Sequence, residues 1–110
     1  MFEPIQVITT TATEDDARTI ARALIDARLA ACVQVEGPIE SLYRWEGQIE
    51  TSHEWRCTAK TARSCFRRLE EVIGKIHTYQ LPEIVAIPLV TASDAYLDWL
   101  RGQIDLDPRR

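Results

Sequence analysis

The sequence predicts an α+β fold in which an antiparallel four-stranded sheet carries two helices on one face, with a further helix near the C-terminus. Three observations lead to this fold. Segments typical of strands and of helices follow one another in the order strand, helix, strand, strand, helix, strand, helix. The two adjacent strands meet at Glu46-Gly47, a step suited to a hairpin turn. The whole order fits within 110 residues, which favours a ferredoxin-like βαββαβ sandwich with an extra C-terminal helix.

Length and composition indicate one domain. The chain has 110 residues, 45% of them hydrophobic, which is enough to bury a core without disulfide bonds. No repeat or Gly/Ser-rich linker divides it, so we predict a single domain over residues 1–110, with about 105–110 as a loose C-terminal tail. Cys32, Cys57 and Cys65 are odd in number and widely spaced, which favours buried free thiols over a zinc or redox site.

Charge and hydropathy argue against two kinds of partner. Thirteen basic residues against 17 acidic ones give a net charge of -4, which does not suit a general nucleic-acid binder. No stretch has the roughly 18 consecutive apolar residues of a membrane span, and the N-terminus "MFEPIQVITT" lacks the pattern of a signal peptide. We therefore expect a cytoplasmic protein that contacts neither nucleic acid nor membrane.

The first two elements have clear local signals. The segment "PIQVITTT" is short and rich in β-branched residues, as a strand should be. Apolar residues then recur at helical spacing from Ala17 to Leu29. Thr13 precedes three acidic residues and can accept a hydrogen bond from the backbone near Asp16, which predicts the start of the helix.

A long hairpin is predicted next, from residue 31 to 61. The odd positions from Ile49 to Ala59 alternate with polar ones, so we expect the odd side to be buried and the even side to face water. Gly37-Pro38 interrupts the first arm and indicates a bulge or kink. The hairpin carries Tyr43, Trp45 and Trp55, and an exposed group of large aromatic side chains usually marks an association surface. We therefore expect a homo-oligomer in which this hairpin contributes to the interface.

The remaining elements follow the same reasoning. Apolar spacing in "TARSCFRRLEEVIGKIH" predicts the second helix, and "EIVAIPLV" reads as a strand whose Pro88 favours a sheet edge or a bulge. Ser93 is a candidate N-cap for a last helix with an apolar stripe from Tyr96 to Ile104.

Several of these segments together resemble the CutA divalent-cation-tolerance family, in the same order and with the same spacing over most of the chain. They are "RLAACVQV", "SLYRWEGQIE", "KT", "HTYQLPEI" and "YLDWL". The resemblance implies a homotrimer of ferredoxin-like subunits whose hairpins pair around a threefold axis. It also implies similarity to the trimeric PII-type signalling proteins, which bind small ligands in clefts between subunits, and a link to copper and other divalent cations.

The resemblance also gives the candidate site residues. The family can carry a metal site made of a Cys on the first strand and a His-His pair; here Thr9 and Ile76 replace two of these ligands, which leaves His77 as the metal candidate. Copper favours imidazole and thiolate ligands, so no metal is required and Cu(II) or another divalent cation is expected to bind weakly. His77 is either a hydrogen-bonded loop residue or a ligand.

The segment that follows His77 supplies the candidates for a ligand cleft between subunits. They are Tyr79, Gln80 and Glu83, and Glu83 could instead cap backbone N–H groups.

The motif search favours a protein that is not an enzyme. The chain has no GxSxG, HExxH, Walker or GxGxxG motif, and its two histidines offer few groups for acid-base chemistry. The leading hypothesis is a trimeric protein of divalent-cation tolerance that binds copper or a small ligand. The alternatives are a trimeric adaptor that anchors another protein, and a PII-like sensor of nucleotides or metabolites.

Overall fold

A computed structural model describes residues 2–106 of the chain. It contains four strands, three α-helices and a short 3₁₀ turn. In chain order these are β1 (Pro4–Thr11), α1 (Glu14–Asp26), β2 (Cys32–Trp45), β3 (Gln48–Ala62), the 3₁₀ turn (Arg63–Cys65), α2 (Phe66–Ile76), β4 (Val85–Pro88) and α3 (Asp94–Gln103).

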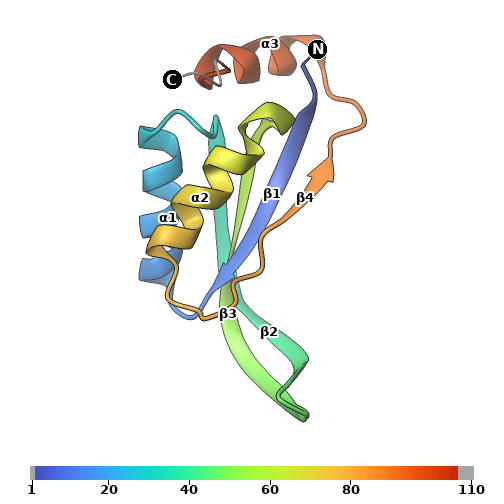
Figure 1. The fold of residues 1–110 in the computed structure, drawn as a ribbon. Coiled ribbons are helices and arrows are strands. Elements are labelled where there is room, and N and C mark those ends of the chain that lie inside the picture. Colours follow the sequence, from blue (N-terminus) through green and yellow to red (C-terminus); the bar gives the residue numbers. More distant parts are fainter. Residues whose placement is uncertain (1, 107–110) are drawn as a thin grey trace.

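The strands form one antiparallel sheet in the order β2-β3-β1-β4. Helices α1 and α2 lie on the same face of this sheet, and α3 crosses the end of the sheet where β1 begins (Figure 1). The β2–β3 hairpin extends well past the helices at the opposite end. The predicted antiparallel sheet with two covering helices and an extra third helix is confirmed, and β4 is an edge strand as its Pro88 indicated.

The core lies between the sheet and the two covering helices. Strand β1 contributes Val7, α1 contributes Ile20 and Leu24, and α2 contributes Leu69 and Ile73, all nearly inaccessible to water. Burying an aliphatic side chain of this size stabilises a fold by about 1.5–3 kcal/mol. The helical spacing read from the sequence therefore identifies the faces that hold the layers together.

Helix α1 begins where the sequence predicted. Thr13 has extended backbone angles, and its hydroxyl accepts a hydrogen bond from the Asp16 N–H at 3.0 Å. The helix ends earlier than its apolar spacing indicated, at Asp26, because Arg28 adopts a positive φ of 58° that no helix can continue. Leu29 is buried as its apolar spacing indicated, but it lies after the end of the helix.

Two further boundaries differ from the prediction. Thr61 lies in β3, as the predicted hairpin required, and Ala62 also belongs to β3 and not to the second helix. Both are buried, and the Thr61 hydroxyl donates to the Leu29 carbonyl at 2.7 Å. Strand β4 is limited to Val85–Pro88, the residues in register with β1, and the Leu89 N–H donates to the Pro4 carbonyl just beyond its end.

The hairpin turn and the bulge are confirmed. Trp45 and Gln48 pair across a two-residue loop in which Glu46 and Gly47 have φ of 51° and 79°. Both angles are positive, as the tight turns that fit twisted strands require. The register between β2 and β3 shifts between Glu36 and Ile39, at the predicted Gly37-Pro38 interruption.

The alternation predicted for β3 is correct only near the helices. Cys57 and Ala59 are buried as expected, and burial raises the pKa of the Cys57 thiol to about 11. Nearer its tip the hairpin extends beyond the helices, which no longer cover it. Ile49 is therefore 64% exposed although it lies on the same side of β3 as Cys57 and Ala59. The prediction was also wrong for Glu54, which lies at an even position expected to face water and is only 7% exposed.

The expected loose tail began at about residue 105, but the first two residues of that stretch are attached to the fold. The Asp105 N–H donates to the Arg28 carbonyl, and Arg68 donates to the Asp105 carbonyl, both at 2.8 Å. Leu106 packs against the core. The rest of the predicted tail, 107–110, lies outside the described residues.

Within residues 2–106, no helix is both long enough and apolar enough to cross a membrane. Cys32, Cys57 and Cys65 are free thiols, and the last two are buried while Cys32 is half-buried.

Candidate functional site: an acidic, aromatic pocket at the base of the hairpin

A cavity of about 610 Å³ lies where the hairpin leaves the body of the protein. Three segments form it: the end of β1, both arms of the hairpin, and the loop between α2 and β4. Its lining residues are Thr10, Ser41, Leu42, Tyr43, Trp45, Glu54, Tyr79, Gln80, Leu81 and Glu83. The volume is in the range of small-molecule sites, which is about 300–1,000 Å³.

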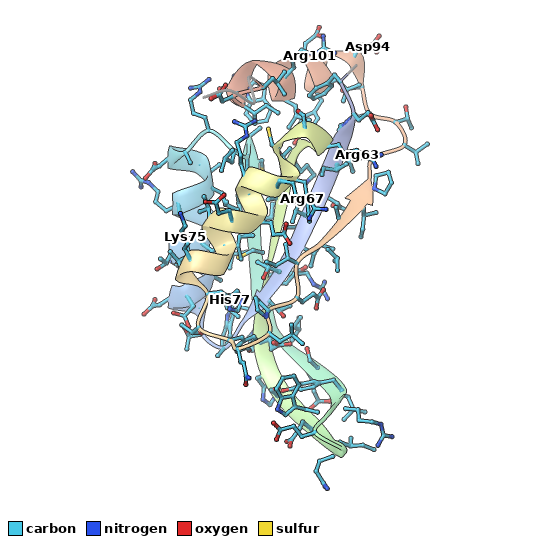
Figure 2. All side chains as sticks on the ribbon, viewed as in Figure 1. Arg63, Arg67, Lys75, His77, Asp94 and Arg101 are labelled. Carbon is cyan, nitrogen blue, oxygen red and sulfur yellow. The ribbon has the colours of Figure 1, made fainter. Side chains whose placement is uncertain are left out.

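His77 holds the loop of this pocket in place. It follows the last residue of α2, and Figure 2 shows it at the end of that helix nearest the hairpin. Its Nδ1 atom accepts a hydrogen bond from the Tyr79 N–H at 3.0 Å, so Nε2 carries the proton and donates to the Thr10 carbonyl at 2.8 Å. Both ring nitrogens therefore bind backbone groups, and the neutral imidazole connects the loop to β1.

Tyr79 continues this arrangement into the pocket. Its ring contacts the His77 ring with centroids 4.9 Å apart, and its hydroxyl donates to Glu54 Oε2 at 2.8 Å. Burial, and then the neighbouring Glu54 carboxylate, raise the pKa of Tyr79 above its usual range. The phenol is therefore a permanent donor at neutral pH, and it fixes one oxygen of Glu54.

Glu54 is the site residue that sequence reasoning missed. The alternation of β3 placed it in water, and Tyr79, which covers it, is 25 residues away in the chain. Neither residue type nor spacing in the sequence signals such a pair. The contact between Tyr79 and Glu54 forms only because the loop after α2 packs against the base of the hairpin in the tertiary structure.

The pocket is acidic without compensation from its own lining. Among the described residues that line it, Glu54 and Glu83 are carboxylates and none is Lys, Arg or His. The ion pairs found in residues 2–106 are all made by other side chains. A cavity with these walls attracts cations and repels anions such as phosphates.

The structure brings together five of the residues singled out from the sequence and leaves two outside. The cleft candidates Tyr79, Gln80 and Glu83 share the pocket with the interface candidates Tyr43 and Trp45. This grouping joins the predicted ligand cleft to one face of the predicted interface.

Trp55 and His77 are the two that do not line the pocket. Tyr43 and Trp45 lie opposite Glu50 and Gln48, which are even positions of β3. Trp55 is at an odd position of β3, and its side chain therefore faces the other side of the hairpin.

Thr9, at the position of the metal-binding Cys implied by the resemblance, does not face the pocket. It pairs with Cys57 on the helix-covered side of the sheet, and its buried hydroxyl oxygen has no hydrogen-bond partner in the structure. Nowhere between residues 2 and 106 do three His, Cys, Asp or Glu side chains come close enough together to hold a metal ion.

A scan against protein-family models matches residues 5–103 to the CutA1 divalent ion tolerance protein family. The chain belongs to the CutA1 family. The resemblance noted from the sequence is thereby confirmed. The divalent-cation tolerance protein CutA of Thermus thermophilus is 43% identical over 95 residues, which is 86% of this chain and 92% of that protein.

Solved CutA1 structures share the fold. The one from Thermus thermophilus has a TM-score of 0.90 with 40% identity, covering 93% of this chain and 99% of that one. CutA1 from Oryza sativa has a TM-score of 0.92 with 32% identity, covering 96% of each chain. A third, from Archaeoglobus fulgidus, has a TM-score of 0.89 with 31% identity over 93% of this chain and 99% of that one, and is described as periplasmic. The cytoplasmic location expected for this CutA1 protein stays a prediction.

Proposed function

We propose that this CutA1 family member is a homotrimeric, non-enzymatic protein of divalent-cation tolerance whose pocket binds a positively charged ligand where subunits meet. One observation carries the proposal. Glu54 is buried in a cavity with Tyr79 as its hydrogen-bond partner, and no cationic side chain of residues 2–106 pairs with it. A buried carboxylate is costly unless a partner of opposite charge compensates it. A bound cation would be that partner.

The hairpin supports the trimer. Tyr43 and Trp45 lie on one of its faces and Leu42 and Ile49 on the other, with exposed fractions from 37% to 72%. A lone subunit leaves both faces in water, whereas in a trimer a neighbouring copy would bury the face with Leu42 and Ile49 and border the cleft that Tyr43 and Trp45 line. Large apolar side chains left exposed on a projecting hairpin are typical of an interface.

Replacing Leu42 with glutamate is expected to convert the trimer to monomers, because a charge would enter an apolar contact. Light scattering at micromolar concentration measures the mass. Leu42→Met keeps the volume and apolar character of the side chain and should remain trimeric. A monomeric wild-type protein would disprove the trimer, and an unaltered mass for Leu42→Glu would remove Leu42 from the interface.

His77 can bind copper only at a cost. Both of its ring nitrogens are hydrogen-bonded to backbone, so a Cu(II) ion would have to displace one of these bonds. The carboxylates of the pocket suit harder cations, and one subunit supplies two of them. We therefore expect Cu(II) binding to be weak, with the remaining ligands supplied by a neighbouring subunit or by water.

Calorimetric titration of tag-free protein with Cu(II) is expected to show weak, saturable binding that disappears in His77→Ala. Since that substitution also releases the loop from β1, the trimer mass of the variant serves as its control. Equal Cu(II) binding by wild type and variant would mean that His77 has a structural role alone. Mn(II) or Ca(II) binding lost in Glu54→Gln would assign the cation to the pocket.

A trimeric adaptor is the second candidate. Its support is the absence of a three-ligand cluster within residues 2–106, together with exposed apolar side chains such as Val90, between β4 and α3, and Trp99 on α3. Flat titrations with metals and a partner that purifies with the trimer at fixed stoichiometry would favour it. A PII-like sensor of nucleotides fits less well, because phosphates would meet two carboxylates in the pocket and no cationic side chain of residues 2–106.

A further inference from the structure

We propose that the ligand of this pocket is a small organic cation, with an ammonium or guanidinium group on an aliphatic body, and not a bare metal ion. This inference rests on the proposed function to the extent that the pocket is the binding site. It names the chemical class of the ligand from the walls of the cavity.

The charged end of such a ligand finds its counter-charge at Glu54. Tyr79 occupies Oε2 of this carboxylate at 2.8 Å, and no hydrogen bond within the described chain engages Oε1. Oε1 can therefore accept an N–H from the ligand. Glu83, also in the lining, adds a second negative charge that needs no direct contact to attract a cation.

The aliphatic body of the ligand would contact the aromatic and aliphatic side chains that line the cavity. Tyr43, Trp45 and Tyr79 line the same cavity as the carboxylates, and the faces of aromatic rings attract cations. Leu81, in the loop after α2, adds apolar surface for methylene groups. Two of the rings are held in place before any ligand arrives, because the Tyr43 and Ser52 hydroxyls are hydrogen-bonded at 2.8 Å and Tyr79 is bonded to Glu54. Side chains already ordered lose less entropy on binding.

A bare metal ion suits this lining less well than an organic cation does. Divalent cations need several oxygen, nitrogen or sulfur ligands around them. The lining supplies two carboxylates and the neutral side chains of Thr10, Ser41 and Gln80, and within residues 2–106 no three His, Cys, Asp or Glu side chains come together to hold an ion. An ammonium group requires only a few acceptors, and the rest of the molecule is stabilised by apolar contact. The cavity of about 610 Å³ has room for such a molecule.

The cationic side chain of a neighbouring hairpin, Arg44, is the competing occupant. The tip from residue 40 to 50 also carries Glu40, Glu46 and Glu50, so bringing it to Glu54 and Glu83 places like charges together. This repulsion favours a free small molecule over Arg44 of a second copy as the cation beside Glu54, and it leaves the Leu42 and Ile49 face available for contact with neighbouring copies.

The test is calorimetric titration of the whole oligomeric protein with butylammonium, 1,4-diaminobutane and tetramethylammonium, with butyrate as the anionic control. We expect saturable binding of the amines and none of butyrate. Glu54→Gln keeps an acceptor for Tyr79 but removes the charge, and should weaken amine binding tenfold or more. Trp45→Leu, at a partly exposed position that does not threaten folding, should weaken it about two- to thirtyfold.

Asp94→Asn is the charge-removal control, since it removes one carboxylate charge from an exposed residue of α3, at the end of the sheet away from the hairpin, and its affinity should match that of wild type. Absence of amine binding to wild type, or equal binding by Glu54→Gln, overturns the inference. If divalent ions bind instead and Glu54→Gln abolishes that binding, the proposed function stands and the ligand class is wrong. Amine binding that is seen only in the Arg44→Gln variant would also overturn the inference, because it would mean that Arg44 of a neighbouring subunit occupies the pocket in the wild-type protein.

Discussion

Replacing Leu69 with alanine is expected to lower the free energy of unfolding by about 2–5 kcal/mol, the largest effect anticipated for a single side chain of this protein. Leu69 lies in the middle of α2, is 0% exposed, and belongs to the cluster that joins both helices to β1. Truncation removes its contacts and leaves a cavity that the surrounding helices and sheet cannot fill by relaxing. Chemical denaturation at fixed protein concentration measures the loss.

The control for Leu69→Ala lies on the same helix. Glu71 is exposed and makes one surface ion pair with Lys75, so Glu71→Ala should change stability by less than about 0.5 kcal/mol. A Leu69→Ala variant as stable as Glu71→Ala would show that α2 does not pack on the sheet as described.

Replacing Gly37 with alanine is expected to destabilise the protein by about 1–3 kcal/mol and to weaken ligand binding at the pocket as well. A Cβ atom at this position would lie 2.6 Å from Trp55 Cδ1 and 3.0 Å from the Glu54 carbonyl oxygen. The Trp55 ring must move, and so must the backbone at Glu54, whose side chain lines the pocket on the other side of the strand. Denaturation and amine titration measure the two effects.

Gly74→Ala provides the matched comparison. Gly74 lies inside α2 with no neighbouring atom within 4 Å of the place that an alanine methyl would occupy, so alanine there should stabilise the helix by about 0.5–1 kcal/mol. Opposite signs for the two substitutions would confirm that crowding at the bulge decides the result. An unperturbed Gly37→Ala protein would mean that Trp55 has an alternative position at no cost.

The elements that the sequence predicted well are those decided by short-range chemistry. Thr13 caps α1 because its own hydroxyl reaches the N–H three residues on. The hairpin turns at Glu46-Gly47 because the tight turn needs two positive φ angles, which glycine adopts without strain. Ser93 caps α3 in the same local way, accepting from the Tyr96 N–H.

The candidate site was predicted in part. The segment from His77 to Glu83 was recognised as a ligand-cleft loop, and Tyr79, Gln80 and Glu83 do share a cavity. The sequence grouped Trp55 with Tyr43 and Trp45, but strand alternation puts it on the opposite face. The buried carboxylate at Glu54 was missed altogether, although the proposed chemistry depends on it.

The sequence by itself determined the order of strands and helices, the apolar faces that form the core, and the family to which the chain belongs. These properties follow from residue periodicity, caps and turns, which act over a few residues. Only the tertiary structure decided that His77 ties its loop to Thr10 and that Tyr79 covers Glu54. Those two contacts join residues 67 and 25 positions apart, and a carboxylate is buried or exposed according to what folds over it, which no local pattern records.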